Sequence, residues 1–327
     1  MSQATISPAG QGASNGVATF VRNRLLSGEG MLYIGFLVLI LIFALSSPVF
    51  LSWANFANIG RQTALVSIIA VGMTFVIVSG EFDLSVGSGM ALSGVMAALA
   101  MKGIGQSWIV GAMAGVLTGA AIGLVNGILT TKLRIPSFLI TLGSLSIARG
   151  IAMIVTGTRP VIISDTAYYQ LFGEGSVLGV PVPIFWTLVV AIGGIVLLHL
   201  STFGRRVFAT GGNAMAARYS GISTARVKTI SLMLAGTLAG LAGLVLSARS
   251  HAARPDVGVG LELDVITSVI LGGAALSGGR GTIIGALVGS LVIGILNNGL
   301  VLLGVDASVQ LAVKGLIIWA SVAISRK

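Results

Sequence analysis

The side chains of this 327-residue chain that could perform acid–base, nucleophilic or metal chemistry are few. It has nine Asp and Glu residues, two His residues and no Cys. The lack of cysteine excludes a disulfide framework, thiol catalysis and cysteine-ligated metal, and the remaining ligands are few for any metal site. No phosphate-binding loop of the form Gly-x-x-x-x-Gly-Lys-[Ser/Thr] occurs. We therefore predict no catalytic residues, no cofactor and no metal in this chain.

A different group of polar residues could line a path for a solute: Asp83, Ser85, Asn126, Arg149 and Asn298. They lie in or beside apolar stretches, where a polar side chain is often functional. Four of them also have a structural interpretation. Asp83 could cap the helix that follows it, Arg149 could anchor a helix end by extending its long side chain to the interface, and the two asparagines could join helices by hydrogen bonds.

The elements that position these residues must be membrane spans, because the composition is far from that of a soluble protein. Hydrophobic residues make up 55% of the chain and charged residues 9%, where a soluble chain carries about 25% charged residues. The mean hydropathy is +1.03. The fold class that we predict is an all-α polytopic membrane protein.

Long stretches without charge predict about ten membrane-spanning helices, since a span needs about 20 apolar residues. The third and eighth of these are short and rich in glycine and serine, so either could be a broken or re-entrant helix. Lys314 is a lone cation in the tenth; Asp306 would be about 12 Å away along the helix, too far to pair with it. The expected spans cover residues 31–47, 62–80, 84–101, 107–131, 135–156, 184–200, 229–249, 263–279, 282–303 and 307–325.

The distribution of basic residues predicts that both termini are cytoplasmic. In that orientation twelve Lys and Arg residues lie in cytoplasmic segments and five outside, which satisfies the positive-inside rule. The net charge of +10 then needs no nucleic acid to explain it. Residues 1–27 lack the apolar core of a signal peptide and are expected to be a disordered cytoplasmic tail, with residues 28–327 as the transmembrane domain.

Glycines recur at every fourth position in two of the spans, at 111–127 and at 281–289. Such stripes let helix backbones approach closely. The same two spans share a longer pattern, because Asn126-Gly127 and Asn298-Gly299 are each followed sixteen residues later by a glycine. The spans are an odd five apart, so the copies would lie in opposite orientation. This predicts an inverted internal repeat, as many transporters have.

The segment 204–222 is the most informative loop, and it is expected on the cytoplasmic side. Asn213 is a good helix N-cap and Gly221 a good terminator, which predicts a short helix between them. A helix so short is marginal alone, so we expect it to dock on a partner through a smooth face formed by Ala216 and Ala217. An ordinary basic loop is the alternative. The candidate docking residues are Gly204, Arg205, Gly212, Asn213, Ala216, Ala217, Ser220, Gly221 and Ile222.

The segment 204–222 resembles the ATPase-coupling loop of sugar-type ABC importer permeases, the ribose, xylose and galactose permease family. Further segments resemble other motifs of that family, in order and without large gaps from about residue 55 to the C-terminus. Glu81 departs from the family pattern, which usually has an apolar or small residue at this position. The matching segments are 79–88, 136–143, 149–150, 159–160, 271–273 and 278–282.

The resemblance implies a permease subunit in the bacterial inner membrane that translocates a monosaccharide. Its implied partners are a cytoplasmic ATPase, docked through residues 204–222, a periplasmic sugar-binding protein and a second permease copy, in a homodimer or a heterodimer. A branched-chain amino acid permease is an alternative with the same broad fold. An ion-coupled carrier working alone, or a receptor or scaffold, is an alternative from another class, although the few intramembrane carboxylates argue against ion coupling.

Overall fold

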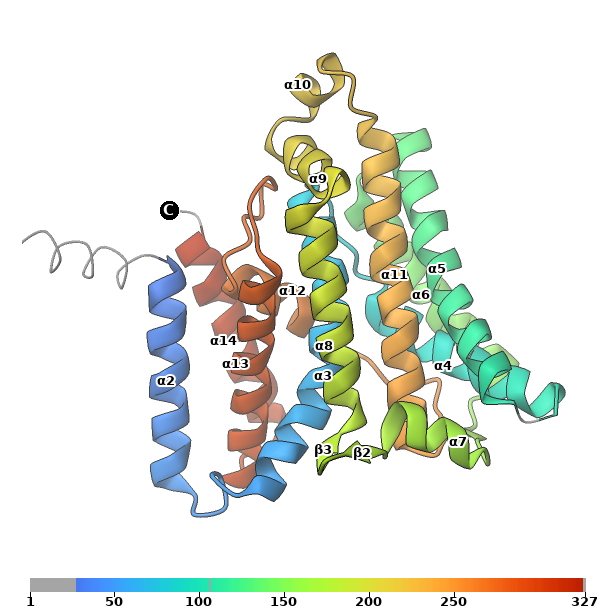
Figure 1. Ribbon diagram of the computed structural model, residues 1–327, viewed down its shortest axis with the longest axis vertical. Helices are drawn as coiled ribbons and strands as arrows, with labels where there is room; N and C mark the ends of the chain where they lie inside the picture. The colour runs from blue at the N-terminus through green and yellow to red at the C-terminus, as the bar shows by residue number, and fades with distance from the viewer. Residues whose placement is uncertain (1–27, 106, 326–327) are drawn as a thin grey trace, which may run out of the picture.

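The computed structural model describes residues 28–105 and 107–325, which form a bundle of helices (Figure 1). The tail expected at residues 1–27 lies outside the described residues. Two short antiparallel strand pairs, β1 (Val161–Ile162) with β4 (Ala252–Ala253) and β2 (Ser176–Val177) with β3 (Val180–Pro181), join loops. The helices are α2 (Gly28–Ser46), α3 (Trp53–Val78), α4 (Val86–Gly103), α5 (Trp108–Leu133), α6 (Ser137–Thr156), α7 (Thr166–Tyr168), the π-helix η1 (Tyr169–Gly173), α8 (Val182–Ile195), its π-helical continuation η2 (Val196–Leu200), α9 (Thr202–Gly212), α10 (Ala214–Tyr219), α11 (Thr224–Arg249), α12 (Leu261–Leu271), α13 (Ile283–Leu302) and α14 (Ala307–Ser325).

Seven helices among the described residues are long and apolar enough to cross a membrane. They are α3, α4, α5, α6, α8 with η2, α11 and α13. Helices α2 and α14 contribute shorter apolar stretches, Tyr33–Ser46 and Ser308–Ile317. The all-helical, polytopic fold class predicted from composition is therefore confirmed.

The eighth expected span, residues 263–279, is not a continuous helix but a short helix followed by a loop, which agrees with the broken-helix alternative given for it. Helix α12 has 11 residues, about 16 Å at the rise of an α-helix, which is too short to cross the hydrocarbon layer. It ends where the backbone enters the left-handed region at Gly273, with φ +91°, and Gly278 and Gly279 adopt the same region further on. Glycine adopts this conformation without steric cost, so residues 272–282 form a loop.

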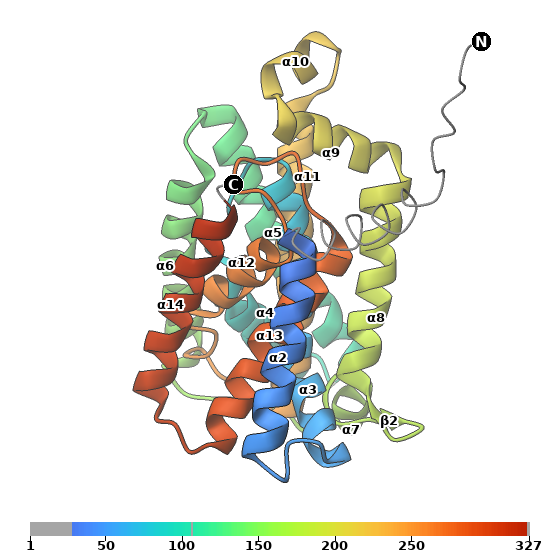
Figure 2. The ribbon, with the colours of Figure 1, turned by 90° about the vertical axis from the view of Figure 1, so that its left-hand side faces the viewer.

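The two ends of the bundle differ in what they carry. Helix α10 projects from one end, and α2 begins and α14 ends at that same end (Figures 1 and 2). We refer to it as the α10 end. The opposite end carries α7 and the β2–β3 hairpin (Figure 1).

Glycine stripes bring helix backbones into direct contact, as their spacing predicts. On α5, a Cβ at Gly119 would overlap the backbone of Gly236 and Gly240 on α11. On α13, a Cβ at Gly285 would overlap the backbone of Gly272 at the end of α12. These contacts replace the hydrophobic drive that lipid does not supply between helices.

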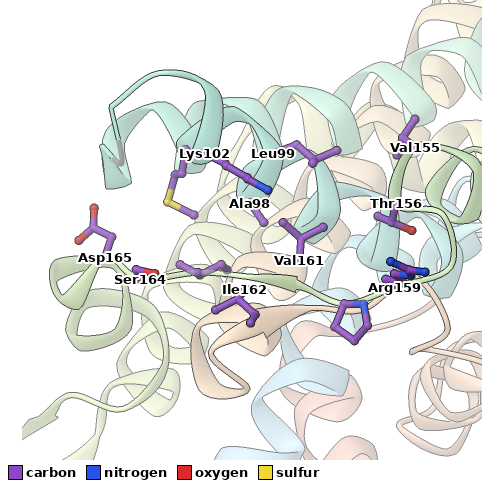
Figure 3. Close-up of a pocket in the computed structure, with 13 residues that line it drawn as sticks. Ala98, Leu99, Lys102, Val155, Thr156, Arg159, Val161, Ile162, Ser164 and Asp165 are labelled. Atoms are coloured by element: carbon purple, nitrogen blue, oxygen red, sulfur yellow. The ribbon is translucent and has the colours of Figure 1, made fainter.

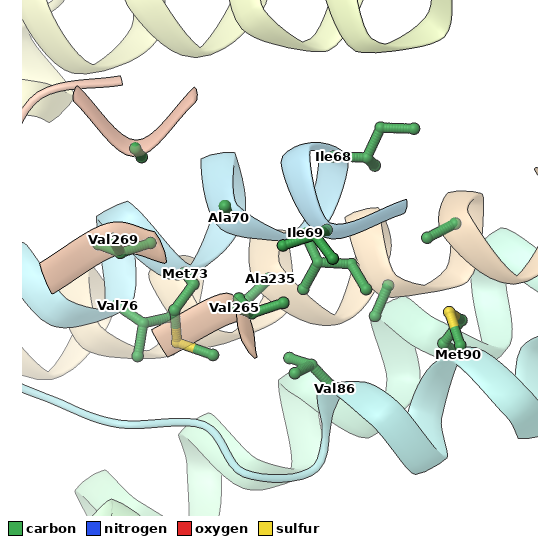
Figure 4. Close-up of a cluster of buried hydrophobic side chains, with 14 of the residues drawn as sticks. Ile68, Ile69, Ala70, Met73, Val76, Val86, Met90, Ala235, Val265 and Val269 are labelled. Carbon is green, nitrogen blue, oxygen red and sulfur yellow. The ribbon is translucent and has the colours of Figure 1, made fainter. Parts of the chain in front are cut away.

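The main apolar core lies where α3, α4, α11 and α12 meet (Figure 4). Ile69 and Met73 of α3 pack there with Ala235 of α11 and Val265 of α12, all of them fully buried. Helix α3 is the most enclosed span, with 83% of its apolar window buried, whereas α6 has 17%. The bundle therefore wraps around α3 and leaves α6 at its surface.

Candidate functional site

Helix α10 is the short helix predicted between Asn213 and Gly221. The Oδ1 of Asn213 accepts hydrogen bonds from the backbone N–H groups of Met215 and Ala216, both at 3.0 Å. Gly221 follows the helix with φ +81°, and the N–H of Ile222 donates to the Ala217 carbonyl at 3.0 Å. The predicted N-cap and terminator are both confirmed.

The exposed face of α10 differs from the sequence interpretation. Ala217 is only 4% exposed, so it does not form a docking face with Ala216. Consecutive residues on an α-helix point about 100° apart. Ala217 therefore packs against the rest of the chain, whereas Ala216 is exposed. Met215 and Tyr219, 64% and 87% exposed, lie on the outside instead. They are four residues apart and therefore share one face.

Helix α9 was missed from the sequence, which treated residues 204–212 as loop. The Oγ of Ser201 accepts a hydrogen bond from the N–H of Gly204 at 3.1 Å and so caps the helix. Phe203 stacks on Phe75 of α3, with ring centroids 6.2 Å apart, and Val207 is fully buried. The serine cap and the apolar residues at positions 203 and 207, four apart, were a signal for this helix.

The remaining residues of the candidate loop fall into two groups. Gly204 is buried, and Ile222 is half-buried. The Oγ of Ser220 donates to the Ala216 carbonyl at 3.0 Å and so supports the end of α10. The exposed residues are Arg205, Gly212, Asn213, Ala216, Ser220 and Gly221.

Three of the five candidate path residues form one hydrogen-bonded chain inside the bundle. The Oδ1 of Asp83 accepts from the N–H and Oγ–H of Ser85, at 2.8 and 2.6 Å. Asn126 donates from Nδ2 to the Ser85 Oγ at 2.9 Å and accepts at Oδ1 from Ser144 at 2.5 Å. Asp83, Ser85 and Asn126 are at most 1% exposed. The chain therefore joins the α3–α4 connection to α5 and α6.

The expectation that Asp83 caps the next helix is corrected by this geometry. Ser85 is the N-cap residue of α4, and the Asp83 carboxylate binds Ser85 rather than the first free N–H groups of the helix. The Asp83 side chain thus closes an Asx-turn, in which its carboxylate accepts the backbone N–H two residues further along the chain. Ser144, which sequence reasoning did not single out, is the fourth member of the chain.

The other two candidate path residues lie elsewhere. Arg149 of α6 donates through Nη1 to the backbone carbonyls of Pro255 and Val257, both at 2.5 Å, and so fastens α6 to the loop before α12. Asn298 of α13 exchanges two amide hydrogen bonds with Asn55 of α3, at 2.9 and 3.1 Å. The five residues therefore do not form a single site.

The loop before α12, to which Arg149 binds, also contains an exposed ion pair between Arg254 and Asp256. The guanidinium of Arg254 donates to both carboxylate oxygens of Asp256, at 3.1 and 2.7 Å. The hydrogen bond and charge of Arg254 hold the pKa of Asp256 below its usual range. This carboxylate is therefore ionised at neutral pH and balances the charge of Arg254.

Two further ion pairs join residues far apart in the chain. Lys314 of α14, for which the sequence offered no partner, lies 2.8 Å from Asp264 of α12. Asp306 is therefore not its partner, in agreement with the distance argument from the sequence. Lys228 of α11 lies 2.5 Å from Glu81, between α3 and α4. Neither pairing follows a sequence spacing, because the partners meet only through tertiary packing.

The chain is similar to known permeases over most of its length. The family described as the permease component of branched-chain amino acid transport systems matches residues 55–322. The ribose import permease protein of Bacillus subtilis (strain 168) is 44% identical over 90% of this chain and 92% of its own length. The corresponding protein of Escherichia coli (strain K12) is 43% identical over 90% and 92%. The L-arabinose transport system permease protein of Escherichia coli (strain K12) is 36% identical over 98% and 97%.

This chain belongs to that permease family. It is a multi-pass membrane protein and the permease subunit of an ABC importer, not an enzyme. Permease subunits of this family carry no cofactor, as expected for this chain. No solved structure matches the chain.

The permease has a cavity of about 480 Å³ between the end of α4, the end of α6 and residues 159–165 (Figure 3). Lys102 at the end of α4 and Arg159 after α6 contribute cations to its wall. Asp165 also lines it, but its Oδ1 accepts hydrogen bonds from the backbone N–H groups of Ala167 and Tyr168. The cavity wall is thus more basic than acidic.

Proposed function

We propose that this permease translocates a pentose of the ribose or arabinose class, delivered by a binding protein and driven by a separate ATPase. The observation that carries the proposal is the end-to-end similarity to ribose and arabinose permeases, at 36–44% identity over about nine-tenths of the chain or more. An uncharged sugar is held by hydroxyl and amide partners rather than by buried charges. The membrane would be the bacterial inner membrane.

The α10 end would face the cytoplasm and dock the ATPase through α9 and α10. Its support is the positive-inside distribution of basic residues and the exposed pair Met215 and Tyr219 on a capped helix that projects from the bundle. Large, rigid aromatic side chains are frequent anchors in protein interfaces. Both termini would then be cytoplasmic.

The chain would pass the membrane ten times, with the eighth pass discontinuous because α12 is short and is followed by the loop 272–282. Support comes from the helix order, in which every expected span contains a helix. An inverted repeat is consistent with the two asparagines. Asn126-Gly127 and Asn298-Gly299 lie on α5 and α13, the fourth and ninth expected spans. Broken helices are a frequent feature of transporters.

The translocation path would run beside α6, with a second permease copy completing its wall. Helix α6 is 17% buried but carries Ser144 and Arg149. Ser144 and Arg149 are bonded within the chain, so the support is the large surface of α6 that the chain itself leaves uncovered and that a second copy could pack against. ATP binding would move α9 and α10 and alternate the access of this path.

Reconstitution tests the proposal. We expect proteoliposomes that hold the permease, its ATPase and its binding protein to concentrate labelled ribose or arabinose only when ATP is present inside. Uptake that persists without the ATPase and collapses with an uncoupler would identify an ion-coupled carrier instead. Capture of leucine rather than a pentose by the cognate binding protein would identify an amino acid permease.

A further inference from the structure

The connection between α3 and α4, residues 79–85, contacts several elements near the α10 end; we refer to it as the α3–α4 turn. Val78, the last residue of α3, immediately precedes this turn. Its backbone carbonyl lies so close to Gly211 of α9 that a Cβ on Gly211 would overlap it. The same carbonyl accepts a hydrogen bond from Gly279 at 2.9 Å, and the backbone of Gly278 packs against Gly80 and Gly211. Three backbone segments thus touch without side chains between them, so a displacement of α9 acts on this turn directly.

An ion pair fastens the other side of the turn to α11. The Glu81 Oε1 lies 2.5 Å from the Lys228 Nζ, and the two side chains are 11% and 22% exposed. Lys228 is four residues from the first residue of α11, Thr224, which follows α10 after residues 220–223. The pair therefore joins the turn to the helix that leads out of the docking loop.

The α3–α4 turn also holds α6 at two points. The N–H of Phe82 donates to the Oγ of Ser137, the first residue of α6, at 3.0 Å. Seven residues further along α6, Ser144 bonds Asn126, which bonds Ser85 at the end of the turn. Since residues seven apart lie about two helical turns apart on one face, α6 and the turn are joined along one side of the helix.

We propose that Glu81 and Lys228 are positioning residues that keep the α3–α4 turn in register with α11, so that movement of α9 and α10 is transmitted to α6. The inference rests on the proposed function, because it takes the ATPase to be what moves α9 and α10. Coupling between distant sites is carried by packed and hydrogen-bonded elements of this kind.

The physical basis is the cost of an unpaired, poorly solvated charge. With either partner removed, the other charge is left in a site that is mostly shielded from water. The turn would then shift to expose it, and the backbone contacts at Gly211 and Gly279 would no longer act on a fixed segment. The ATPase would still dock, since α10 lies outside this contact. The movement of α9 and α10 that ATP hydrolysis drives would, however, reach α6 less effectively.

The test compares sugar uptake per ATP hydrolysed in the reconstituted transporter for E81K, K228E and the swapped double variant E81K/K228E. We expect each single reversal to lower this ratio about tenfold while the ATPase still co-purifies, and the swap to recover most of it, as a direct pairwise interaction predicts. K132E is the matched control, because Lys132 is an exposed lysine at the end of α5. Its ratio should match that of the wild type.

The outcomes separate this inference from the proposed function. If the wild-type complex shows no ATP-driven uptake, the proposed function fails. If the wild type transports and the single variants keep its ratio, or if the swap assembles but recovers nothing, the positioning role is overturned. Should the reversed-charge variants fail to assemble, E81Q keeps the shape and removes the charge. A wild-type ratio in E81Q also overturns the inference, and a severalfold loss supports it.

Discussion

Lys314 of α14 and Asp264 of α12 form an ion pair, with 2.8 Å between Nζ and Oδ2, that fastens the short helix α12 to the last helix of the bundle. Helix α12 is too short to be held by spanning the membrane. Its position depends on the contacts that its neighbours, chiefly α13, α3 and α14, make with it. The pair therefore adds a direct link between α12 and α14 to the packing of α12 on α3 and α13.

We expect D264N to lower the thermal midpoint of the purified permease clearly. Removing one partner of a buried pair costs about 3–5 kcal/mol, and the loss here should be nearer the lower limit because Lys314 keeps a quarter of its side chain exposed. The control is D256N, which breaks an exposed pair worth about 0–1 kcal/mol. Equal midpoints for the two variants would show that the Asp264 pair does not stabilise α12.

The outward face of α10 predicts which residues bind the ATPase. We expect Y219D and M215D to reduce co-purification of the ATPase strongly, because both side chains are exposed on one face and an aspartate would place a charge in the interface. L178D is the control, since Leu178 is 98% exposed at the opposite end. Normal ATPase binding by Y219D and M215D together would exclude this face as the docking surface.

The Asn213 cap predicts a graded effect on the same interaction. N213A removes the acceptor of two backbone hydrogen bonds and should cost about 1 kcal/mol of helix stability. The affinity for the ATPase, measured by titration in detergent, should fall severalfold. N213D keeps a capping oxygen and should bind as the wild type does. If N213A binds normally, α10 does not need to be folded before docking.

The absence of native cysteine allows a direct test of exposure. In Y219C a thiol reagent should react rapidly with the free permease and slowly once the ATPase is bound, because the side chain would be covered. In A217C the reaction should be slow in both states, because Ala217 is buried against its own chain. Rapid labelling of A217C would contradict the packing of α10 described above.

The glycine contact between α5 and α11 predicts a large effect of a single methyl group. G119A should destabilise the permease by about 1–3 kcal/mol, the usual cost of overpacking, because the new Cβ would overlap the α11 backbone. G143A on α6 is the matched control, since no atom lies within 4 Å of a Cβ at that position. The comparison is made by thermal unfolding in the same detergent. A midpoint for G119A equal to that of G143A would contradict the prediction, because it would show that α5 and α11 can move apart to accept the methyl group at no cost in stability.

The local features of the chain were predictable from the sequence because they depend on a few neighbouring residues. Apolar stretches located the helices and glycine spacing their close contacts, while Asn213 and Gly221 marked the ends of α10. The helix starts were less accurate. Helix α3 begins at Trp53 and α11 at Thr224, before the expected starts at residues 62 and 229, because a helix continues into the polar region while its backbone hydrogen bonds are satisfied.

The candidate site was only partly predictable. Asp83, Ser85 and Asn126 were selected one by one, and the structure joins them into a chain with Ser144. Arg149 and Asn298 were selected on the same grounds but bond in other places. Sequence identifies a polar residue in an apolar stretch; it does not say which helix that residue faces.

The sequence by itself determined that this is a helical membrane permease, because composition, charge distribution and motif spacing are properties of the linear chain. Only the tertiary structure decided the partners of Lys228 and Lys314, the burial of Ala217 and the meeting of Gly80, Gly211 and Gly278. These relationships join residues that can be more than a hundred positions apart. They are set by how the helices cross, and no local preference encodes that.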